Sequence, residues 1–427
     1  MERKSNESYP LVDGVVAKFI GDLRAYAEAH PESPDARIAL DGILDNLVRE
    51  AVGAMPAEGE AELAIRRLEE LVTLFPKSPV PLLYLSKICI DKKDHDTALR
   101  YLEVGLTVEP DNPDLIFNRA LCLQETGSPD EAIEGFRHHI ELRPDNPWAY
   151  NNIGDAYRTL GLYDRAEAYL KLAIQNDHRF GPAYYNLTML YMDQQDWPGC
   201  VHYAKIAERL DPFNKEVQLA LGDGYVGLGK PELALQHLVT ATLIDRSFVE
   251  AYETMAAAYV SLSMYELGIA AAHEALKLKP DSWMASANIG YCYAKQGRYA
   301  DAIHAERTAS RHNPDKEGMY KLYWDLGWNL LQMDEYAQAL ECTEQAIRMK
   351  EYPDLALTFN KGLILLALGD ARGADAVYDQ AVKRAKALDN YQAIADAVRE
   401  AENFIARKGI HVDKASTLFK LLEGSPE

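Results

Sequence analysis

Asparagine side chains recur at a regular spacing through the middle of this chain. Asn118, Asn152 and Asn186 are 34 residues apart, and Asn288 stands three such steps after Asn186. An amide side chain has donors and an acceptor, so a row of amides can hold an extended polypeptide backbone whatever its sequence. Asparagine is also unfavourable inside a helix, because its amide competes for local backbone hydrogen bonds. The recurrence therefore indicates a polypeptide-binding ladder, or alternatively amide bonds between neighbouring helices that set their pitch.

Aromatic and acidic side chains surround this ladder. The ladder is the sixth position of each repeat, counted from the repeat starts given below. From the second repeat to the last, this position holds Asn118, Asn152, Asn186, Ala220, Thr254, Asn288, Asp325 and Asn360. The second, fifth and ninth positions of each repeat are its helical neighbours, and they supply Trp148, Asp155, Tyr185, Met189, Asp223, Glu253, Tyr291, Trp324, Trp328 and Phe359. Flat aromatic rings and adaptable methionines suit recognition. Each aromatic has an alternative role in packing between repeats, since cores and interfaces use the same residue types.

The chain offers no comparable set of residues for catalysis or metal binding. It contains no GxxxxGK[ST], GxSxG or HExxH motif. His138 and His139 are adjacent and would point in different directions from a helix. The five cysteines form no CxxC pair, which argues against a zinc site or a disulfide framework and favours reduced, buried thiols. We therefore expect a protein that is not an enzyme, with no catalytic residue, no metal and no cofactor.

A repeat of 34 residues must position the ladder. Prolines stand at 76, 110, 144, 212, 280 and 314, so successive prolines are 34 or 68 residues apart. A small residue precedes each of these positions by twelve, as Ala98 and Ala132 do. Glycine recurs within a leading helix at Gly154, Gly222 and Gly290. Glycine in a helix costs about 1 kcal/mol relative to alanine, so its return predicts close packing of two helices.

This pattern resembles the tetratricopeptide repeat (TPR), a helix-turn-helix unit of 34 residues. The resemblance implies an all-α fold, a right-handed α-α superhelix of about nine to ten repeats with helical caps, whose leading helices line the concave face. The asparagine ladder is similar to the superhelical repeat region of O-linked N-acetylglucosamine transferase. Nine repeats begin at Pro79, Pro113, Pro147, Gly181, Lys215, Val249, Trp283, Tyr320 and Leu355.

The two ends of the chain depart from this period. We expect residues 1–10 to be disordered, residues 11–78 to form N-terminal helices with a degenerate repeat and an insertion, and residues 79–388 to form the nine units. Residues 389–427 are predicted to form a capping helix and a tail. A cap is needed because the last repeat would otherwise leave an apolar face in water. The tail carries an apolar cluster, STLFKLLEG, that either completes the cap or docks elsewhere.

Charge and hydropathy restrict the partner. With 45 basic and 66 acidic side chains the formal net charge is −21, which disfavours nucleic acid and anionic membrane surfaces. No apolar run approaches the length of a membrane span, so we expect no membrane insertion and a cytoplasmic location. The partner is predicted to be a protein or peptide that is basic or neutral. A homo-oligomer stays open.

These observations predict a non-catalytic interaction scaffold. It would bind an extended polypeptide or partner protein in an acidic, aromatic-lined concave groove. Two alternatives stay open: an assembly or targeting chaperone for one client protein, and a subunit of an enzyme complex. The sequence does not identify the partner or the pathway.

Overall fold

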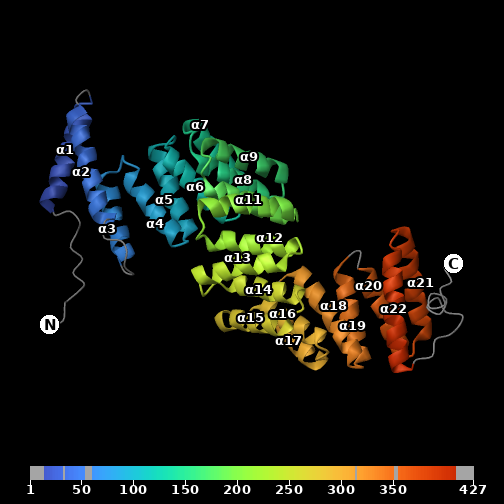
Figure 1. Cartoon of the computed structure of the whole chain (residues 1–427). Coiled ribbons are helices and arrows are strands. Elements are labelled where there is room, and N and C mark those ends of the chain that lie inside the picture. The colour runs from blue at the N-terminus through green and yellow to red at the C-terminus, as the bar shows by residue number, and fades with distance from the viewer. Residues whose placement is uncertain (1–13, 32–33, 53–59, 313–314, 351–353, 410–427) are drawn as a thin grey trace, which may run out of the picture. The chain divides into compact units, whose positions relative to one another are not determined.

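The protein is all-α over residues 14–31, 34–52, 60–312, 315–350 and 354–409, which are the residues that the computed structural model describes (Figure 1). The chain divides into two compact units, which meet between Asp196 and Trp197 in the sequence. The helices of unit 1 are α1 (Gly14–Ala29), α2 (Pro34–Val52), α3 (Glu60–Leu74), α4 (Val80–Asp91), α5 (His95–Val108), α6 (Pro113–Glu125), α7 (Pro129–Leu142), α8 (Pro147–Thr159), α9 (Tyr163–Asn176) and α10 (Gly181–Asp193).

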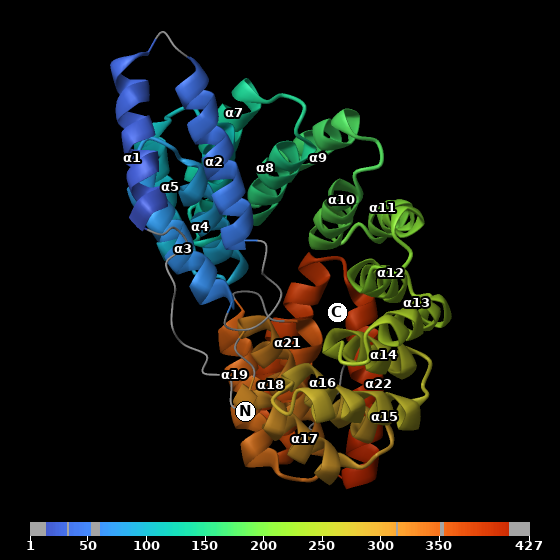
Figure 2. The ribbon, with the colours of Figure 1, turned by 90° about the vertical axis from the view of Figure 1, so that its left-hand side faces the viewer.

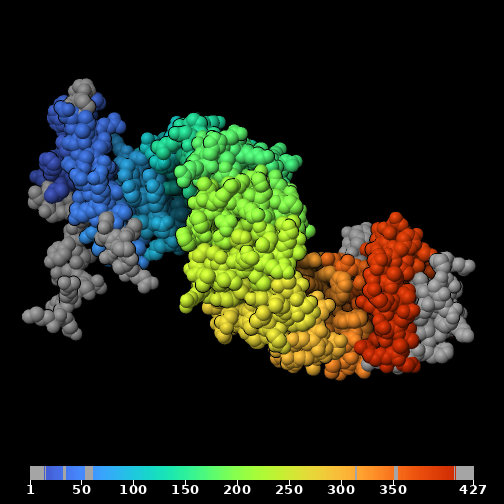
Figure 3. Space-filling view, in the orientation of Figure 1, coloured from blue at the N-terminus to red at the C-terminus, as the bar shows by residue number. Residues whose placement is uncertain are grey.

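Unit 2 continues the same alternation of leading and trailing helices. Its helices are α11 (Trp197–Leu210), α12 (Lys215–Gly227), α13 (Pro231–Ile244), α14 (Val249–Ser261), α15 (Tyr265–Leu278), α16 (Trp283–Lys295), α17 (Tyr299–His312), α18 (Lys316–Gln332), α19 (Tyr336–Met349), α20 (Leu355–Ala367), α21 (Ala371–Ala387) and α22 (Tyr391–Lys408). Each helix packs against the next, and α12, α14 and α16 also contact one another in order. In the space-filling view, α12 to α15 form one continuous surface (Figure 3).

The turn inside each hairpin has one recurring geometry. In α8–α9 the amide of Gly161 donates to the carbonyl of Arg158 and the amide of Leu162 donates to that of Tyr157. Gly161 has a φ of 71°, in the left-handed region. This bonding pattern satisfies carbonyls that the end of a helix leaves without partners. The same pattern returns in the other hairpins, so the two helices of each repeat leave the turn in the same relative direction.

Close helix packing inside the hairpins explains the recurrent helical glycines. A Cβ atom added at Gly154 would lie 2.6 Å from Leu170, and one added at Gly222 would lie 2.5 Å from Leu238. The leading helix therefore supplies no side chain where the trailing helix supplies a leucine. Both leucines are fully buried, so each hairpin has a small dry core of its own.

Several leading helices, α6, α8, α12, α16 and α18 among them, begin with side-chain caps. Asn112 accepts hydrogen bonds from the amides of Asp114 and Leu115, and Asn214 accepts one from Val217. Ser282 accepts one from Ala285. Asparagine and serine are preferred here because they satisfy amides that the first turn of a helix leaves without partners. The caps fix where each repeat begins.

The two ends of the array have larger cores. At the N-terminal end α1 and α2 lie side by side (Figure 2), and Ile20 and Leu44 join a cluster that continues into α3 and α4. At the other end Ala397, Ala401 and Phe404 of α22 are buried against α20 and α21. The segments 1–10 and 410–427 and the insertion at 53–59 lie outside the described residues.

The five cysteines are free thiols. Cys89, Cys122, Cys200 and Cys292 are buried, and Cys342 is half-buried. Burial raises the pKa of Cys122 and of Cys292 to about 11. Cys122 and Cys292 are thus protonated side chains of the hairpin cores.

Candidate functional site

The leading helices carry the residues singled out by the sequence. We define the leading-helix face as the second, fifth, sixth and ninth positions of α6, α8 and α10 in unit 1 and of α12, α14, α16, α18 and α20 in unit 2. Within one helix the second, fifth and ninth positions are three or four residues apart and so lie on one side, and the sixth is four residues from the second and three from the ninth. Positions are counted from the repeat starts Pro113, Pro147, Gly181, Lys215, Val249, Trp283, Tyr320 and Leu355, not from the first residue of each helix.

In unit 1 the ladder asparagines bond partly to one another. Asn186 Nδ2 donates to Asn151 Oδ1 at 3.0 Å, which ties α10 to α8, and Asn151 Nδ2 donates to Asn152 Oδ1 at 3.3 Å. Asn118 is only 8% exposed, and its Nδ2 atom is buried with no hydrogen-bond partner. The ladder thus joins neighbouring repeats and also leaves a buried donor unmatched.

In unit 2 the same position again links leading helices. Asn288 Nδ2 donates to the backbone carbonyl of Glu253 at 3.2 Å. Thr254, which interrupts the run of asparagines, donates from Oγ1 to Asp223 Oδ1 at 2.9 Å and so joins α14 to α12. Asn360 is 7% exposed, and its Oδ1 atom has no partner.

Asp155, on the leading-helix face of unit 1, is neutralised within the protein. Asp155 pairs with Arg158 at 3.0 Å and accepts from Gln124 Nε2 at 2.8 Å. Arg158 also pairs with Asp193 of α10 at 2.7 Å. This network joins α6, α8 and α10, and it gives Asp155 a structural role.

Two carboxyl groups of unit 2 have no such cation. Asp223 is half-buried with one hydrogen bond from Thr254, and Asp325 is half-buried within electrostatic reach of Lys321 and Lys295. Neither forms an ion pair within the part of the chain that the structure describes. Burial raises the pKa of each to about 6, because a charged carboxylate loses hydration that nothing nearby restores.

Glu253 lies on the same face but is buried and accepts a hydrogen bond from Ser282. Burial raises its pKa, while the bond from Ser282 lowers it. Ser282 is also the cap of α16, so this contact fixes the start of the next leading helix.

The aromatic residues differ in how much surface they present. Trp148 is 50% exposed, with its ring edge against Phe180 at a centroid distance of 4.9 Å. Tyr185, Met189 and Tyr291 are half-buried. Trp148 therefore has the most open ring of the set in unit 1.

Trp324 and Trp328 of α18 are half-buried against two core clusters. The ring of Trp324 lies edge-on to Tyr320 at 5.9 Å. Phe359 is different: it is 2% exposed and packs against Tyr378 inside unit 2. Its burial leaves no surface for a partner, so the expectation that Phe359 seats a partner side chain is corrected here.

Sequence reasoning missed a buried carboxyl group between α17 and α18. Glu306 is 1% exposed, and its Oε1 atom accepts from Asn329 Nδ2 at 2.7 Å. Burial, and more weakly the charge of Asp325, raises the pKa of Glu306 to about 8. Leu170 and Leu238 occupy this position in other repeats, so a glutamate at a leucine position was the detectable sign.

No described helix is long and apolar enough to cross a bilayer. Within the same residues, no group of three or more His, Cys, Asp and Glu is placed to hold a metal ion.

Family models of the tetratricopeptide repeat match residues 85–151, 149–177, 254–315 and 325–393. The bovine BBSome complex member BBS4 is 25% identical over 294 residues, covering 67% of this chain and 54% of the relative. The BBSome complex member BBS4 homolog of Drosophila melanogaster is 21% identical over 369 residues, which cover 74% of this chain and 75% of that relative. The human protein O-mannosyl-transferase TMTC1 is 33% identical over 95 residues, which cover 21% of this chain and 11% of that relative. The chain thus spans about half the length of the bovine relative.

Solved structures show similarity at low sequence identity. YrrB, described as a TPR protein with an unusual peptide-binding site, has a TM-score of 0.37 at 22% identity, covering 43% of this chain and 94% of its own. A TPR protein from Parabacteroides merdae has a TM-score of 0.49 at 17% identity, covering 59% and 98%. The repeat period, the hairpins and the family models agree: this chain belongs to the tetratricopeptide repeat family, whose fold typically serves as a scaffold for protein interactions.

Proposed function

We propose that this protein is a non-catalytic scaffold that binds an extended, basic or neutral polypeptide on the leading-helix face of each unit. The observation that carries the proposal is the pair of half-buried carboxyl groups, Asp223 and Asp325, whose pKa values burial raises to about 6. Each has a desolvated charge without an ion-pair partner among the described residues. A lysine or arginine of the partner placed beside each carboxyl group would stabilise its charge.

The unmatched amide atoms support backbone binding. Leaving a buried polar group without a partner costs about 1–3 kcal/mol. Asn118 Nδ2 is a buried donor and Asn360 Oδ1 is a buried acceptor, and both are unmatched. Rotation of either amide side chain toward the surface would let a peptide group of an extended chain supply the complementary acceptor or donor. Trp148, with its open ring, would contact partner side chains.

The similarity to BBS4, a protein named as a member of a complex, supports stable membership in a multiprotein assembly. In that setting the scaffold would hold one partner for long times rather than sample many.

The direct test uses a capped (Lys-Ala)₅ peptide with a fluorescent label, and capped (Ser-Ala)₅ and (Glu-Ala)₅ peptides for comparison. We expect fluorescence anisotropy to rank affinity as lysine, then serine, then glutamate. The double variant Asp223→Asn/Asp325→Asn should weaken binding of the lysine peptide and leave that of the serine peptide almost unchanged. Glu232→Gln/Glu402→Gln makes the same charge change at exposed positions of α13 and α22, and it should retain most of the affinity.

The two aspartates also predict a pH dependence. A bound cation lowers the pKa of a carboxyl group, so binding releases a proton wherever the free protein is protonated. Affinity for the lysine peptide should therefore rise as pH increases from about 5 to 7 and level off above it. The variant Asp223→Asn/Asp325→Asn should lose this rise in affinity. Equal pH profiles for the two proteins would contradict the proposal.

A second variant tests the ladder. In Asn118→Ala/Asn152→Ala, each lost backbone bond should cost about 0.5–1.5 kcal/mol, or roughly tenfold in affinity for the pair. The melting temperature of this variant is the control, because an unchanged value shows that the loss of affinity does not come from a loss of fold. Full affinity for the serine and lysine peptides in this variant would show that the asparagines only join neighbouring helices.

A further inference from the structure

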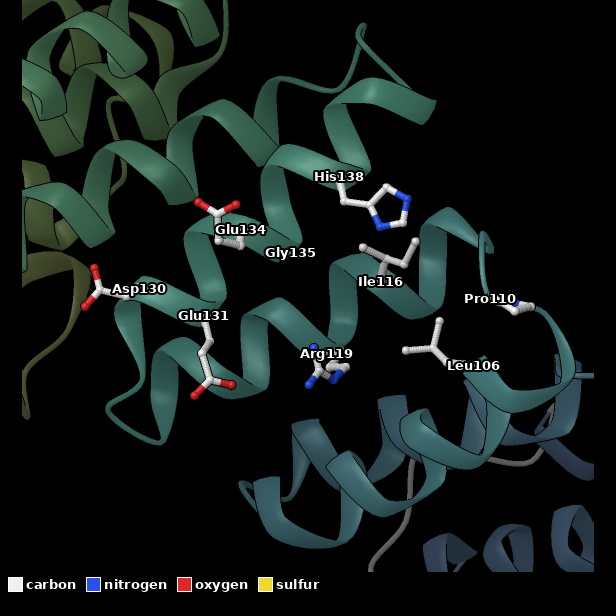
Figure 4. Close-up of a pocket in the computed structure, with 9 residues that line it drawn as sticks. All are labelled: Leu106, Pro110, Ile116, Arg119, Asp130, Glu131, Glu134, Gly135 and His138. Carbon is white, nitrogen blue, oxygen red and sulfur yellow. The ribbon is translucent and has the colours of Figure 1, made fainter.

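A cavity of about 550 Å³ opens on unit 1, away from the leading-helix face. Its wall comes from the trailing helices α5 and α7 and its floor from α6 (Figure 4). The lining residues are Leu106, Pro110, Ile116, Arg119, Asp130, Glu131, Glu134, Gly135 and His138. Figure 4 shows the three carboxylates toward one end and Pro110 and His138 toward the other. The volume lies within the range of about 300–1,000 Å³ that is typical of ligand pockets.

The repeat explains why this cavity exists. Gly135 of α7 occupies a position that holds Tyr101 one repeat earlier and Tyr169 one repeat later. Tyr101 packs against a cluster that contains Val72, Leu82 and Leu85. The residues 34 positions after those three are Leu106, Ile116 and Arg119, which line the cavity. The cavity is therefore the space that a tyrosine fills in the preceding repeat.

The hydroxyl groups of the neighbouring tyrosines show what a ring in this cavity would meet. Tyr101 donates to Glu69 Oε1 of α3 at 2.9 Å. Tyr169 forms a hydrogen bond with Arg137, which raises the pKa of that arginine. The residue of α5 that corresponds to Glu69 is Glu103, which is exposed and has no partner among the described residues. Glu103 is thus an acceptor whose tyrosine is replaced by Gly135.

We propose that this cavity binds a tyrosine side chain of a partner polypeptide. The ring would rest on Leu106, Ile116 and Gly135, and its hydroxyl would donate to Glu103. Asp130 and Glu131 at the rim favour lysine or arginine beside that tyrosine. Arg119 replaces the buried Leu85 of the preceding repeat and places a cation beside the ring, where its attraction to the π face adds to binding. The site is separate from the leading-helix face, so the two proposals stand or fall independently.

The test uses the full chain and a capped peptide, Lys-Ser-Tyr-Ser-Lys, with versions that carry Phe, Leu or Ala in place of Tyr. Saturation-transfer NMR titration measures each dissociation constant. We expect the order Tyr, Phe, Leu, Ala. Glu103→Gln should weaken the Tyr peptide about threefold to tenfold and leave the Phe peptide unchanged, because only the phenol bonds to Glu103. Glu141→Gln, an exposed change on α7 outside the cavity, is the matched control.

A second variant fills the cavity from within. A Cβ atom at Gly135 would lie 2.9 Å from the Cβ atom of Ala120, so we combine Gly135→Tyr with Ala120→Gly. The next repeat already has this combination in Gly154 and Tyr169. The double variant should abolish the preference for the Tyr peptide over the Ala peptide while retaining its helical circular dichroism and melting.

Three outcomes would overturn the proposal. One is equal affinity for the Tyr and Leu peptides. Another is an equal effect of Glu103→Gln on the Tyr and Phe peptides, a result that does not depend on how the cavity-filling variant folds. The third is a wild-type chain that dimerises with increasing concentration while the cavity-filling variant stays monomeric. That result would assign the cavity to a second copy of this chain.

Discussion

Single residues in the hairpin turns adopt a left-handed conformation that most side chains disfavour. Ser263 has a φ of 58°, whereas the corresponding residue one repeat earlier is Gly229. The left-handed region costs a non-glycine residue roughly 1–2 kcal/mol, partly offset by the greater freedom of glycine in the unfolded chain. Ser263→Gly should therefore raise the free energy of unfolding by about 0.5–1 kcal/mol, measured by urea titration. Ser261→Gly, two residues earlier at the last residue of α14, should instead lower it by up to roughly 0.5 kcal/mol.

The carboxyl group of Glu306 predicts how stability depends on pH. Its pKa in the fold is about 8, above the usual value of 4.5, so the folded state binds a proton that the unfolded state releases. This contribution to stability is complete below about pH 4.5 and is lost as pH rises through about 8. Glu306→Gln keeps the shape and cannot ionise. It should flatten the fall in melting temperature between pH 5 and 8 and melt higher than the wild type at pH 8.

The groups that share this environment are Asp325, Asn329 and Cys342. Asp325→Asn is therefore the control: it removes the nearby charge but leaves Glu306 able to titrate, so most of the pH dependence should stay. An unchanged profile in Glu306→Gln would show that Glu306 is charged in the fold.

Residue types revealed the ladder but not its bonding. Asn152 and Asn186 were found by spacing alone, yet spacing cannot show that Asn186 bonds to Asn151, because that contact joins two repeats through side-chain geometry. Phe359 illustrates the same limit, since the fifth position is the half-buried Tyr185 in α10 but the fully buried Phe359 in α20. The exchange of tyrosine for Gly135 was readable in the sequence once repeats were compared position by position.

Helices and their starts follow closely from the sequence. Pro113, Pro147, Lys215 and Leu355 are each both a repeat start and the first residue of a helix. The start at Tyr320 is later than the helix, because α18 begins at Lys316 after Asp315 caps the amide of Gly318. The period places a helix, but the local cap decides its first turn.

The helix α22 gives a prediction at the scale of one element. Its Ala397, Ala401 and Phe404 are buried in the core formed with α20 and α21. Deleting the chain after Asp389 exposes that core to water, so α20 and α21 should exchange their amide hydrogens faster. Hydrogen exchange with mass spectrometry measures this. Unchanged protection of α20 and α21 would show that α22 does not act as a cap.

Within each unit every described helix contacts the next along the chain, and this makes stability local. Leu170 is fully buried against Gly154 inside one hairpin, and Leu170→Ala should cost about 2–5 kcal/mol. We expect the loss of amide protection to be greatest in α8 and α9 and absent from α20 to α22. A uniform loss along the chain would instead indicate a single cooperative transition.

The buried cysteines make that local opening visible through chemical reactivity. Alkylating reagents attack the thiolate, and burial keeps Cys122 and Cys292 protonated, with pKa values of about 11. Each can therefore react only while its own hairpin is open, so its labelling rate reads the opening of α6 or α16 separately. With iodoacetamide and peptide mass spectrometry, the half-buried Cys342 should be modified first. The native chain thus carries its own stability sensors, without any engineered label.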